Sequence, residues 1–218
     1  MLTFAETKKE NPFVKLNKRS KQKEIRRLKK QKMGDYYGTI VPQKVKKSDI
    51  ELISEKIVKY LSDNKIIKLS KKENVFSSEN NHLGFEPDIN YHKAVHIYDN
   101  RTPSLVTNGV VIELGRRSFY STNVETVECP NCGLNIWEND AFVDKIKEWE
   151  NETGDGIITC EECGETNSIT EYNFLPEESW AFGEIGITFW NWGEFQDSFI
   201  KELENLIDYK ISIVFGKL

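Results

Sequence analysis

All four cysteines of the 218-residue chain lie in two copies of one short pattern, Cys-x-x-Cys-Gly. Cys129 and Cys132 form the first pair, and Cys160 and Cys163 form the second. Two intervening residues let both thiolates of a pair turn toward one ion, and a glycine can adopt the left-handed conformation that closes the turn. Two disulfides or four free thiols are the alternatives, but the paired spacing favours a zinc ribbon. Four thiolates complete the coordination of Zn²⁺, so we expect one structural ion.

A helix is predicted between the two cysteine pairs. The pairs are separated by 27 residues, more than the roughly 15 to 20 residues usual in a ribbon, so the ribbon over residues 125–170 carries an insertion. Asp140 is a candidate N-cap, and Gly154 with Gly156 ends the pattern. Between them the apolar residues recur at helical spacing, namely Phe142, Val143, Ile146 and Trp149.

The segment before the ribbon predicts a helix and several short strands. Residues 48–51, Ser-Asp-Ile-Glu, form a capping box, and apolar residues repeat on one helical face as far as Asp63. Residues 34–47 are expected to form an extended linker. Short strands are expected over residues 65–69 and 75–76.

Asn108 and Gly109 predict a hairpin, because Asn-Gly suits a tight turn between residues 105–107 and 110–114. Gly115 to Arg117 is expected to end the second strand, and another strand is expected over residues 118–120. The adjacent arginines are expected to pair with acidic groups of the body, although a phosphate or carboxylate ligand is the alternative.

The C-terminal part of the chain predicts a central strand, a helix and a last strand. Apolar residues on both faces over residues 181–192 indicate a strand that is covered on both sides, with Thr188, Trp190 and Trp192 sharing one face. A helical pattern over residues 195–207 and a strand over residues 211–215 follow. Strand, helix and strand in this order favour a parallel crossover. The expected fold class is therefore α+β, with packed helices on a mixed β-sheet that carries the inserted four-cysteine zinc ribbon; a further short strand is expected over residues 169–174.

The net charge of −5 hides a strong asymmetry. Residues 1–47 hold 15 Lys and Arg against 4 Asp and Glu, whereas residues 48–218 hold 15 against 31. The chain is therefore interpreted as a basic arm and linker, 1–47, followed by an acidic body, 48–218.

The densest part of the arm is a candidate nucleic-acid or ribosome contact, because clustered cations gain affinity by displacing phosphate counterions. The candidate residues are Lys18, Arg19, Lys21, Lys23, Arg26, Arg27, Lys29 and Lys30. A solvated tail, or an arm that lies on its own acidic body, is the alternative.

No apolar run approaches about 18 residues, and the N-terminus is charged from Glu6 onward. We therefore expect neither a membrane span nor a signal peptide, and a cytoplasmic protein whose cysteines stay reduced and available to zinc.

Several motifs between residues 84 and 218 occur together: Thr107-Asn108-Gly109, the run from Gly115 to Tyr120, both cysteine pairs, residues 182–192 and the closing Val214-Phe215-Gly216-Lys217-Leu218. This set resembles a family of small uncharacterised bacterial zinc-ribbon proteins, whose members are sometimes labelled sugar ABC transporter ATPases. The resemblance implies the fold and the zinc, brings no agreed activity and does not cover the basic arm. The sequence has no Gly-x-x-x-x-Gly-Lys-Ser/Thr loop, so an ATPase activity has no support.

No catalytic motif is recognisable, since the chain lacks Gly-x-Ser-x-Gly and His-Glu-x-x-His and the cysteines are assigned to metal. We therefore expect no enzyme, and the sequence identifies no small-molecule substrate. His92 and His96 have a spacing that would align them on a helix, so a second metal site is an alternative to ordinary surface histidines.

Two functions follow from these features. The first is a non-catalytic zinc-ribbon protein that acts by protein–protein contact, as an immunity-like inhibitor or an adaptor with a basic partner. The second is a nucleic-acid or ribosome-associated factor that binds phosphate through the arm. The ribbon itself is a poor phosphate ligand, because residues 125–178 hold 15 acidic residues and two lysines.

Overall fold

The computed structural model describes residues 34–76, 82–122, 124–137, 140–154 and 156–218. The chain divides into two units, Met1–Gly34 and Asp35–Leu218. The eight basic candidate residues of the arm, from Lys18 to Lys30, lie outside the described residues. The architecture below is that of the second unit.

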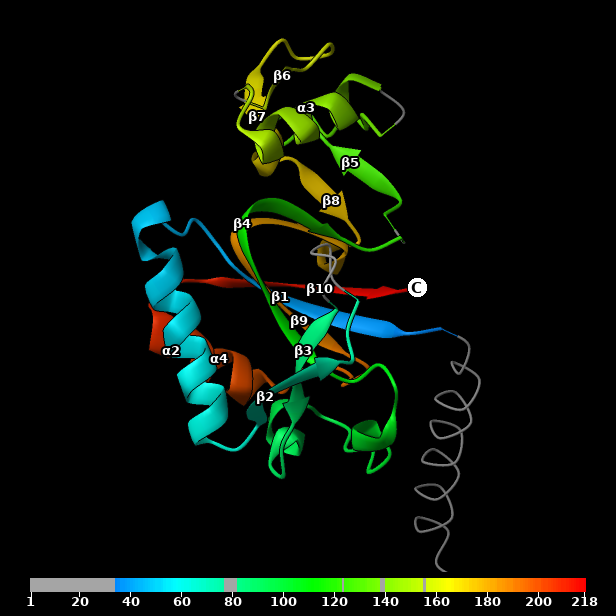
Figure 1. Ribbon diagram of the computed structural model, residues 1–218. Coiled ribbons are helices and arrows are strands. Elements are labelled where there is room, and N and C mark those ends of the chain that lie inside the picture. The colour runs from blue at the N-terminus through cyan, green and yellow to red at the C-terminus, as the bar shows by residue number, and fades with distance from the viewer. Residues whose placement is uncertain (1–33, 77–81, 123, 138–139, 155) are drawn as a thin grey trace, which may run out of the picture. The chain divides into compact units, whose positions relative to one another are not determined.

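Six strands of the described residues form one sheet, in the order β10-β1-β9-β4-β3-β2 (Figure 1). Their bounds are β1 (Tyr36–Pro42), β2 (Ile67–Glu73), β3 (Leu83–Pro87), β4 (Val110–Tyr120), β9 (Trp180–Trp190) and β10 (Ile211–Lys217). Helices α2 (Ile50–Asp63) and α4 (Asp197–Ile207) pack on one face of this sheet. Short 3-10 helices occupy the connections: η1 (Lys47–Asp49), η2 (Tyr91–Ala94), η3 (Thr102–Ser104), η4 (Ile169–Glu171) and η5 (Glu177–Ser179).

The ribbon contributes its own small elements. Helix α3 (Asp140–Asn151) lies between two antiparallel strand pairs, which are β5 (Thr126–Glu128) with β8 (Asn173–Leu175), and β6 (Ile157–Thr159) with β7 (Thr166–Ser168). The predicted inserted helix is therefore confirmed. The strand expected over residues 169–174 is replaced by η4 followed by β8, because Ser168 and Glu171 form a capping box that turns the chain.

The expected mixed sheet is wrong, because every pairing between the described strands is antiparallel. β9 and β10 do run in the same direction, in agreement with the strand-helix-strand pattern. They are not neighbours, however, because β1 lies between them and pairs antiparallel with both. Strand β1 thus occupies the position between β9 and β10, where the sequence predicts a direct parallel pairing of those two strands.

The same strand corrects the predicted linker and the predicted domain boundary at residue 47. Tyr36–Pro42 is a strand of the sheet, and its residues Ile40 and Val41 are fully buried. The second unit accordingly begins at Asp35. The extended backbone expected before Pro42 is present, but it has a paired strand on each side instead of solvent.

The buried face of helix α2 agrees with the prediction, but the structure of its first turn does not. Ile53, Ile57 and Leu61 are buried at helical spacing against the sheet. The predicted capping box is wrong, because no side chain caps the first turn and Ser48 instead donates a hydrogen bond to Asp49. The chain enters α2 through η1.

The predicted hairpin at Asn108 and Gly109 is also wrong. Residues 105–107 form no strand, and Asn108 is buried, with its amide donating to the carbonyl of Thr102 at 3.0 Å. Asn74 donates to Asn108 Oδ1 at 3.1 Å. A Cβ added at Gly109 would come within 2.4 Å of Asn74 Oδ1, so glycine is required here for close packing.

Gly115 does not end a strand, because β4 continues through it to Tyr120. The register with β9 shifts between Leu114 and Arg117, and Gly115 has φ +97°, which together describe a β-bulge. The bulge brings Arg116 Nε within 3.0 Å of Glu184 and Arg117 within 2.6 Å of Glu113. The expected pairing of these arginines with acidic residues is therefore confirmed.

The prediction of a central strand covered on both faces is confirmed for β9, which is buried from Ala181 to Trp190. Gly186 lets the ring of Phe119 lie directly on the strand, since an added Cβ would be 2.2 Å from that ring. The predicted place of Trp192 is wrong. The strand ends at Trp190, Asn191 has φ +60°, and the turn packs Trp192 on Phe189 of the opposite face.

Candidate metal centre

The two cysteine turns have matching backbone geometry. The N–H of Gly133 donates to the carbonyl of Cys129 at 3.0 Å, and the N–H of Gly164 donates to that of Cys160 at 2.9 Å. Both glycines adopt positive φ, +75° and +71°. The left-handed glycine predicted after each pair is confirmed, and it leaves the N–H groups of each turn facing the sulfur atoms.

The four sulfur atoms converge. Cys129, Cys132, Cys160 and Cys163 offer ligand atoms that all lie within 4.8 Å of one another. Across the two turns, the sulfur atoms of Cys132 and Cys160 are 3.6 Å apart and those of Cys129 and Cys163 are 3.9 Å apart. A tetrahedral ion with about 2.3 Å bonds to sulfur separates its ligands by about 3.8 Å. A disulfide requires about 2.05 Å, and all four cysteines are free.

The electrostatics of the thiols suit a cation at their centre. Burial opposes ionisation of Cys129, but hydrogen bonds from the backbone of Asn131 and Cys132 outweigh it and lower the pKa of this thiol to about 7. A backbone hydrogen bond from Leu134 favours the Cys132 thiolate, yet burial and the neighbouring cysteines together raise its pKa to about 12. The neighbouring cysteines therefore hinder ionisation of the Cys132 thiol, and a bound cation would favour its thiolate.

A separate hydrophobic core supports the centre. It includes Val127, Ile136, Phe142, Ile146 and Phe174, together with the buried Cys129 and Cys160. Phe142 and Ile146 come from the face of α3 that the sequence predicts. Val143, predicted on the same face, is 48% exposed.

Helix α3 also joins the ribbon to the large sheet. The rings of Trp149 and Phe182 of β9 meet edge to face at 5.0 Å, and the guanidinium of Arg116 lies 5.0 Å from the Trp149 ring. Glu150 accepts hydrogen bonds from the backbone and side chain of Ser118 at 2.7 and 2.5 Å. The bulge in β4 therefore supplies the groups on which α3 docks.

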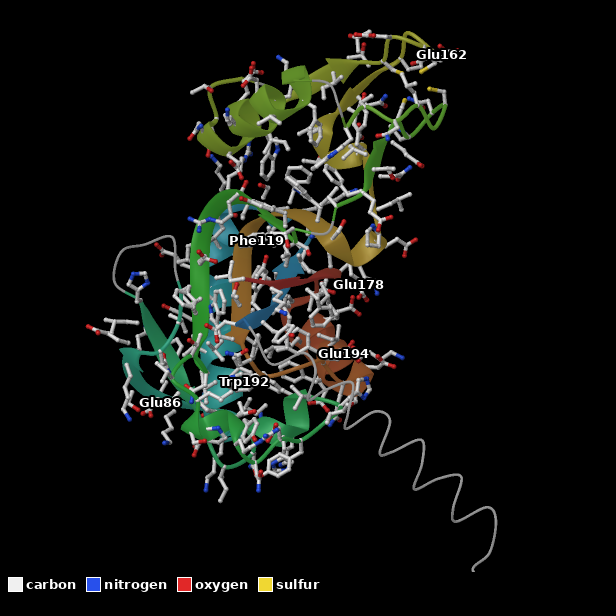
Figure 2. The ribbon with its side chains drawn as sticks, turned by 90° about the vertical axis from the view of Figure 1, so that its right-hand side faces the viewer. Glu86, Phe119, Glu162, Glu178, Trp192 and Glu194 are labelled. Carbon is white, nitrogen blue, oxygen red and sulfur yellow. The ribbon has the colours of Figure 1, made fainter. Side chains whose placement is uncertain are left out.

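Acidic side chains are exposed on the ribbon, and Glu161 and Glu162 lie within its second cysteine turn. Figure 2 shows Glu162 at the end of the ribbon that carries the cysteine sulfur atoms. Exposed carboxylates of the ribbon are Glu125, Asp144, Glu152, Glu161, Glu162 and Glu165, and Glu171, Glu177 and Glu178 follow it in the chain. A metal bound by four thiolates adds a formal charge of about −2 to this surface.

The histidines do not form a second centre in the described part of the chain. His92 belongs to η2, which ends at Ala94, so no α-helix aligns it with His96. Among the described residues, the four cysteines are the one group of three or more potential ligands close enough to share an ion. The ring of His92 instead contacts Tyr91 and Tyr98.

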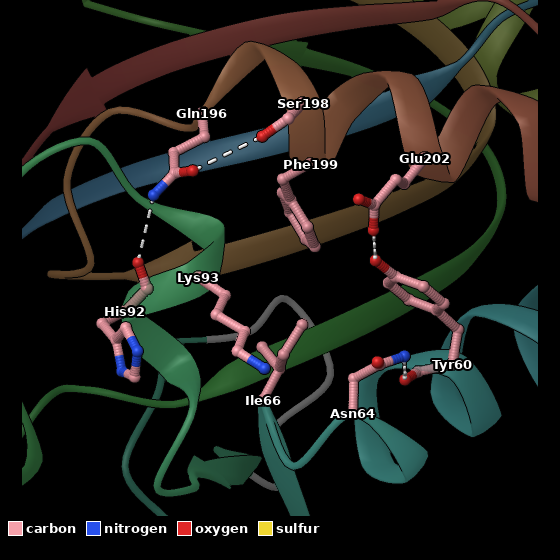
Figure 3. Close-up of a pocket in the computed structure, with 9 residues that line it drawn as sticks. All are labelled: Tyr60, Asn64, Ile66, His92, Lys93, Gln196, Ser198, Phe199 and Glu202. Atoms are coloured by element: carbon pink, nitrogen blue, oxygen red, sulfur yellow. Dashed lines mark hydrogen bonds between the residues drawn. The ribbon is translucent and has the colours of Figure 1, made fainter.

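A pocket of about 300 Å³ lies between the end of α2, η2 and the start of α4 (Figure 3). Tyr60 donates a hydrogen bond to Glu202 across it, and Phe199 and Ile66 supply apolar walls. Burial and the contact with Glu202 raise the pKa of Tyr60, so this hydroxyl remains a donor rather than a base. No sequence pattern signals this pocket, because its walls come from three distant segments.

No protein-family model, curated protein or solved structure matches the chain. The resemblance to bacterial zinc-ribbon proteins therefore stays a prediction. Within the described residues, no helix is long and apolar enough to cross a membrane.

Proposed function

We propose that the chain is a non-catalytic zinc-ribbon protein that acts by binding another protein through its acidic folded unit. Zinc is the metal that four thiolates at tetrahedral spacing favour. With four protein ligands the ion has no coordination position for water or substrate, so its role is structural. Binding of such an ion contributes about 10–16 kcal/mol to folding in small zinc modules.

The observation that carries the protein-binding proposal is the charge of the ribbon. Its exposed surface combines carboxylates with few cations; Lys147 pairs with Asp144, and Lys145 pairs with Glu148. Such a surface repels phosphate and attracts a basic protein. An immunity-like inhibitor or an adaptor fits this property.

Binding of nucleic acid or ribosome through the arm is the second candidate, and the cluster from Lys18 to Lys30 supports it. In this case the acidic unit would recruit or position a further component. The two candidates differ in which part of the chain touches which class of molecule.

A photoreactive amino acid placed at Glu162 or at Lys23 of the full chain distinguishes them in bacterial cells. The protein-binding proposal predicts protein adducts at position 162 that persist when the eight basic arm residues are replaced by glutamine. Nuclease-sensitive adducts at position 23, with none at position 162, would refute it and establish the second candidate. Glu55, exposed on α2, is the matched control position.

A further inference from the structure

Four large apolar side chains of the described ribbon are exposed; one is Ile157 in β6, and the other three follow the first cysteine pair in sequence. Leu134 is 36% exposed, Trp137 40% and Val143 48%. We call these three residues the ribbon patch. The ring centroid of Trp137 lies 6.1 Å from that of Phe142, the residue that precedes Val143 on α3. Ile136, which lies between Leu134 and Trp137 in the sequence, is buried in the ribbon core.

The backbone beneath the patch is held in place. Asn135 Oδ1 accepts hydrogen bonds from the N–H of Trp137 at 3.0 Å and from that of Val127 at 3.2 Å. The carbonyl of Leu134 accepts from Cys129 at 2.9 Å. The backbone of Leu134 and Trp137 is therefore held in a fixed position, which lowers the ordering cost of a contact.

Acidic residues of the facing cysteine turn and of α3 are the candidates for a rim of the patch. Leu134 follows Cys132 by two residues, and the sulfur of Cys132 lies 3.6 Å from that of Cys160, so Glu161 and Glu162 belong to the facing turn. Asp144 follows Val143 on α3 and is exposed. Interfaces commonly place an aromatic anchor such as tryptophan at the centre of a polar rim.

We propose that the ribbon patch is the docking surface for an amphipathic, lysine- and arginine-rich segment of a partner protein. Apolar side chains of that segment would cover Trp137 and Val143, and its cations would face Glu161, Glu162 and Asp144. This inference rests on the proposed function and specifies its site. Charge complementarity selects this occupant over RNA, whose phosphates the rim repels.

A labelled synthetic helix of leucine and lysine tests the surface by fluorescence anisotropy with the full, zinc-loaded chain. The expected result is that W137A combined with V143A weakens binding about tenfold or more, as loss of an interface anchor does. E161Q with E162Q should weaken binding and reduce its salt dependence. The matched controls are V106A and E55Q, which change exposed residues outside the ribbon and should leave binding within about twofold.

Zinc content and circular dichroism establish that each variant is folded. Equal binding by wild type and the W137A/V143A variant would overturn the docking surface and leave the proposed function standing, because the photo-crosslinks at Glu162 test that function separately. Two further results would also overturn the docking surface. One is that a helix of leucine and glutamate binds as tightly as the helix of leucine and lysine. The other is that an RNA duplex binds equally tightly and still does so after the basic residues of the arm are neutralised.

Discussion

The indole ring of Trp149 and the phenyl ring of Phe182 meet edge to face with their centroids 5.0 Å apart. This contact joins the helix of the four-cysteine ribbon to the central strand of the sheet. We expect W149A to lower the free energy of unfolding by about 2–3 kcal/mol, because it removes a half-buried aromatic ring and the surface under Arg116. Urea denaturation of the zinc-loaded chain measures the change.

The control for this variant is W137A, which removes an equally large but more exposed ring. It should cost less than about 1 kcal/mol. A W149A variant that loses no more stability than W137A would show that the ribbon does not depend on this contact with the sheet.

Gly186 is predicted to be intolerant of even one methyl group. A Cβ at this position would lie 2.2 Å from the ring of Phe119, so we expect G186A to destabilise the chain by about 1–3 kcal/mol. Shortening the partner in a G186A/F119L double variant should recover part of the loss, although F119L alone destabilises. Purely additive effects in this double-mutant cycle would contradict the assigned contact.

The two possible limits of the folded unit differ by strand β1. Deletion of residues 1–33 removes only the arm, whereas deletion of residues 1–47 also removes Ile40 and Val41 from the core and leaves β9 and β10 without their shared neighbour. We expect cooperative thermal unfolding by circular dichroism for the first deletion and none for the second. Equal behaviour of the two proteins would refute the placement of β1.

Tyr172 is predicted to make the protein sensitive to alkali. Burial and the negative charge of the four cysteines raise the pKa of this hydroxyl from 10.0 to about 12. A raised pKa in the folded state contributes stability below pH 10 that is lost as the pH rises toward 12. Y172F should therefore show a shallower loss of unfolding free energy across this range, and an unchanged slope would exclude Tyr172 as its cause.

Features that depend on local spacing are predictable from the sequence. The cysteine pairs, the inserted helix with Phe142 and Ile146, and the buried faces of α2 and α4 each recur at a fixed interval along the chain. The sequence also predicts that Arg116 and Arg117 pair with carboxylates, because the body of the chain is rich in acidic residues.

Features that depend on distant segments are not predictable in this way. Tyr36–Pro42 pairs with strands that are between 147 and 181 residues away, and nothing beside it in sequence signals those neighbours. Asn108 has the residue type of a turn, but its amide contacts Asn74, which is 34 residues away. The ribbon patch has no sequence signal of its own, because Val143 fits the same helical pattern as the buried Phe142 and Ile146.

The stoichiometry of bound zinc tests the central claim most directly. The full chain, purified under reducing conditions and measured by inductively coupled plasma mass spectrometry, should carry one zinc ion per chain. C132S and C163S, which change the two exposed ligands, should each lose most of the metal, whereas S104A, at an exposed position outside the ribbon, should retain it. Absence of stoichiometric zinc in the wild-type chain, or full retention in both cysteine variants, would contradict a structural centre of four cysteines.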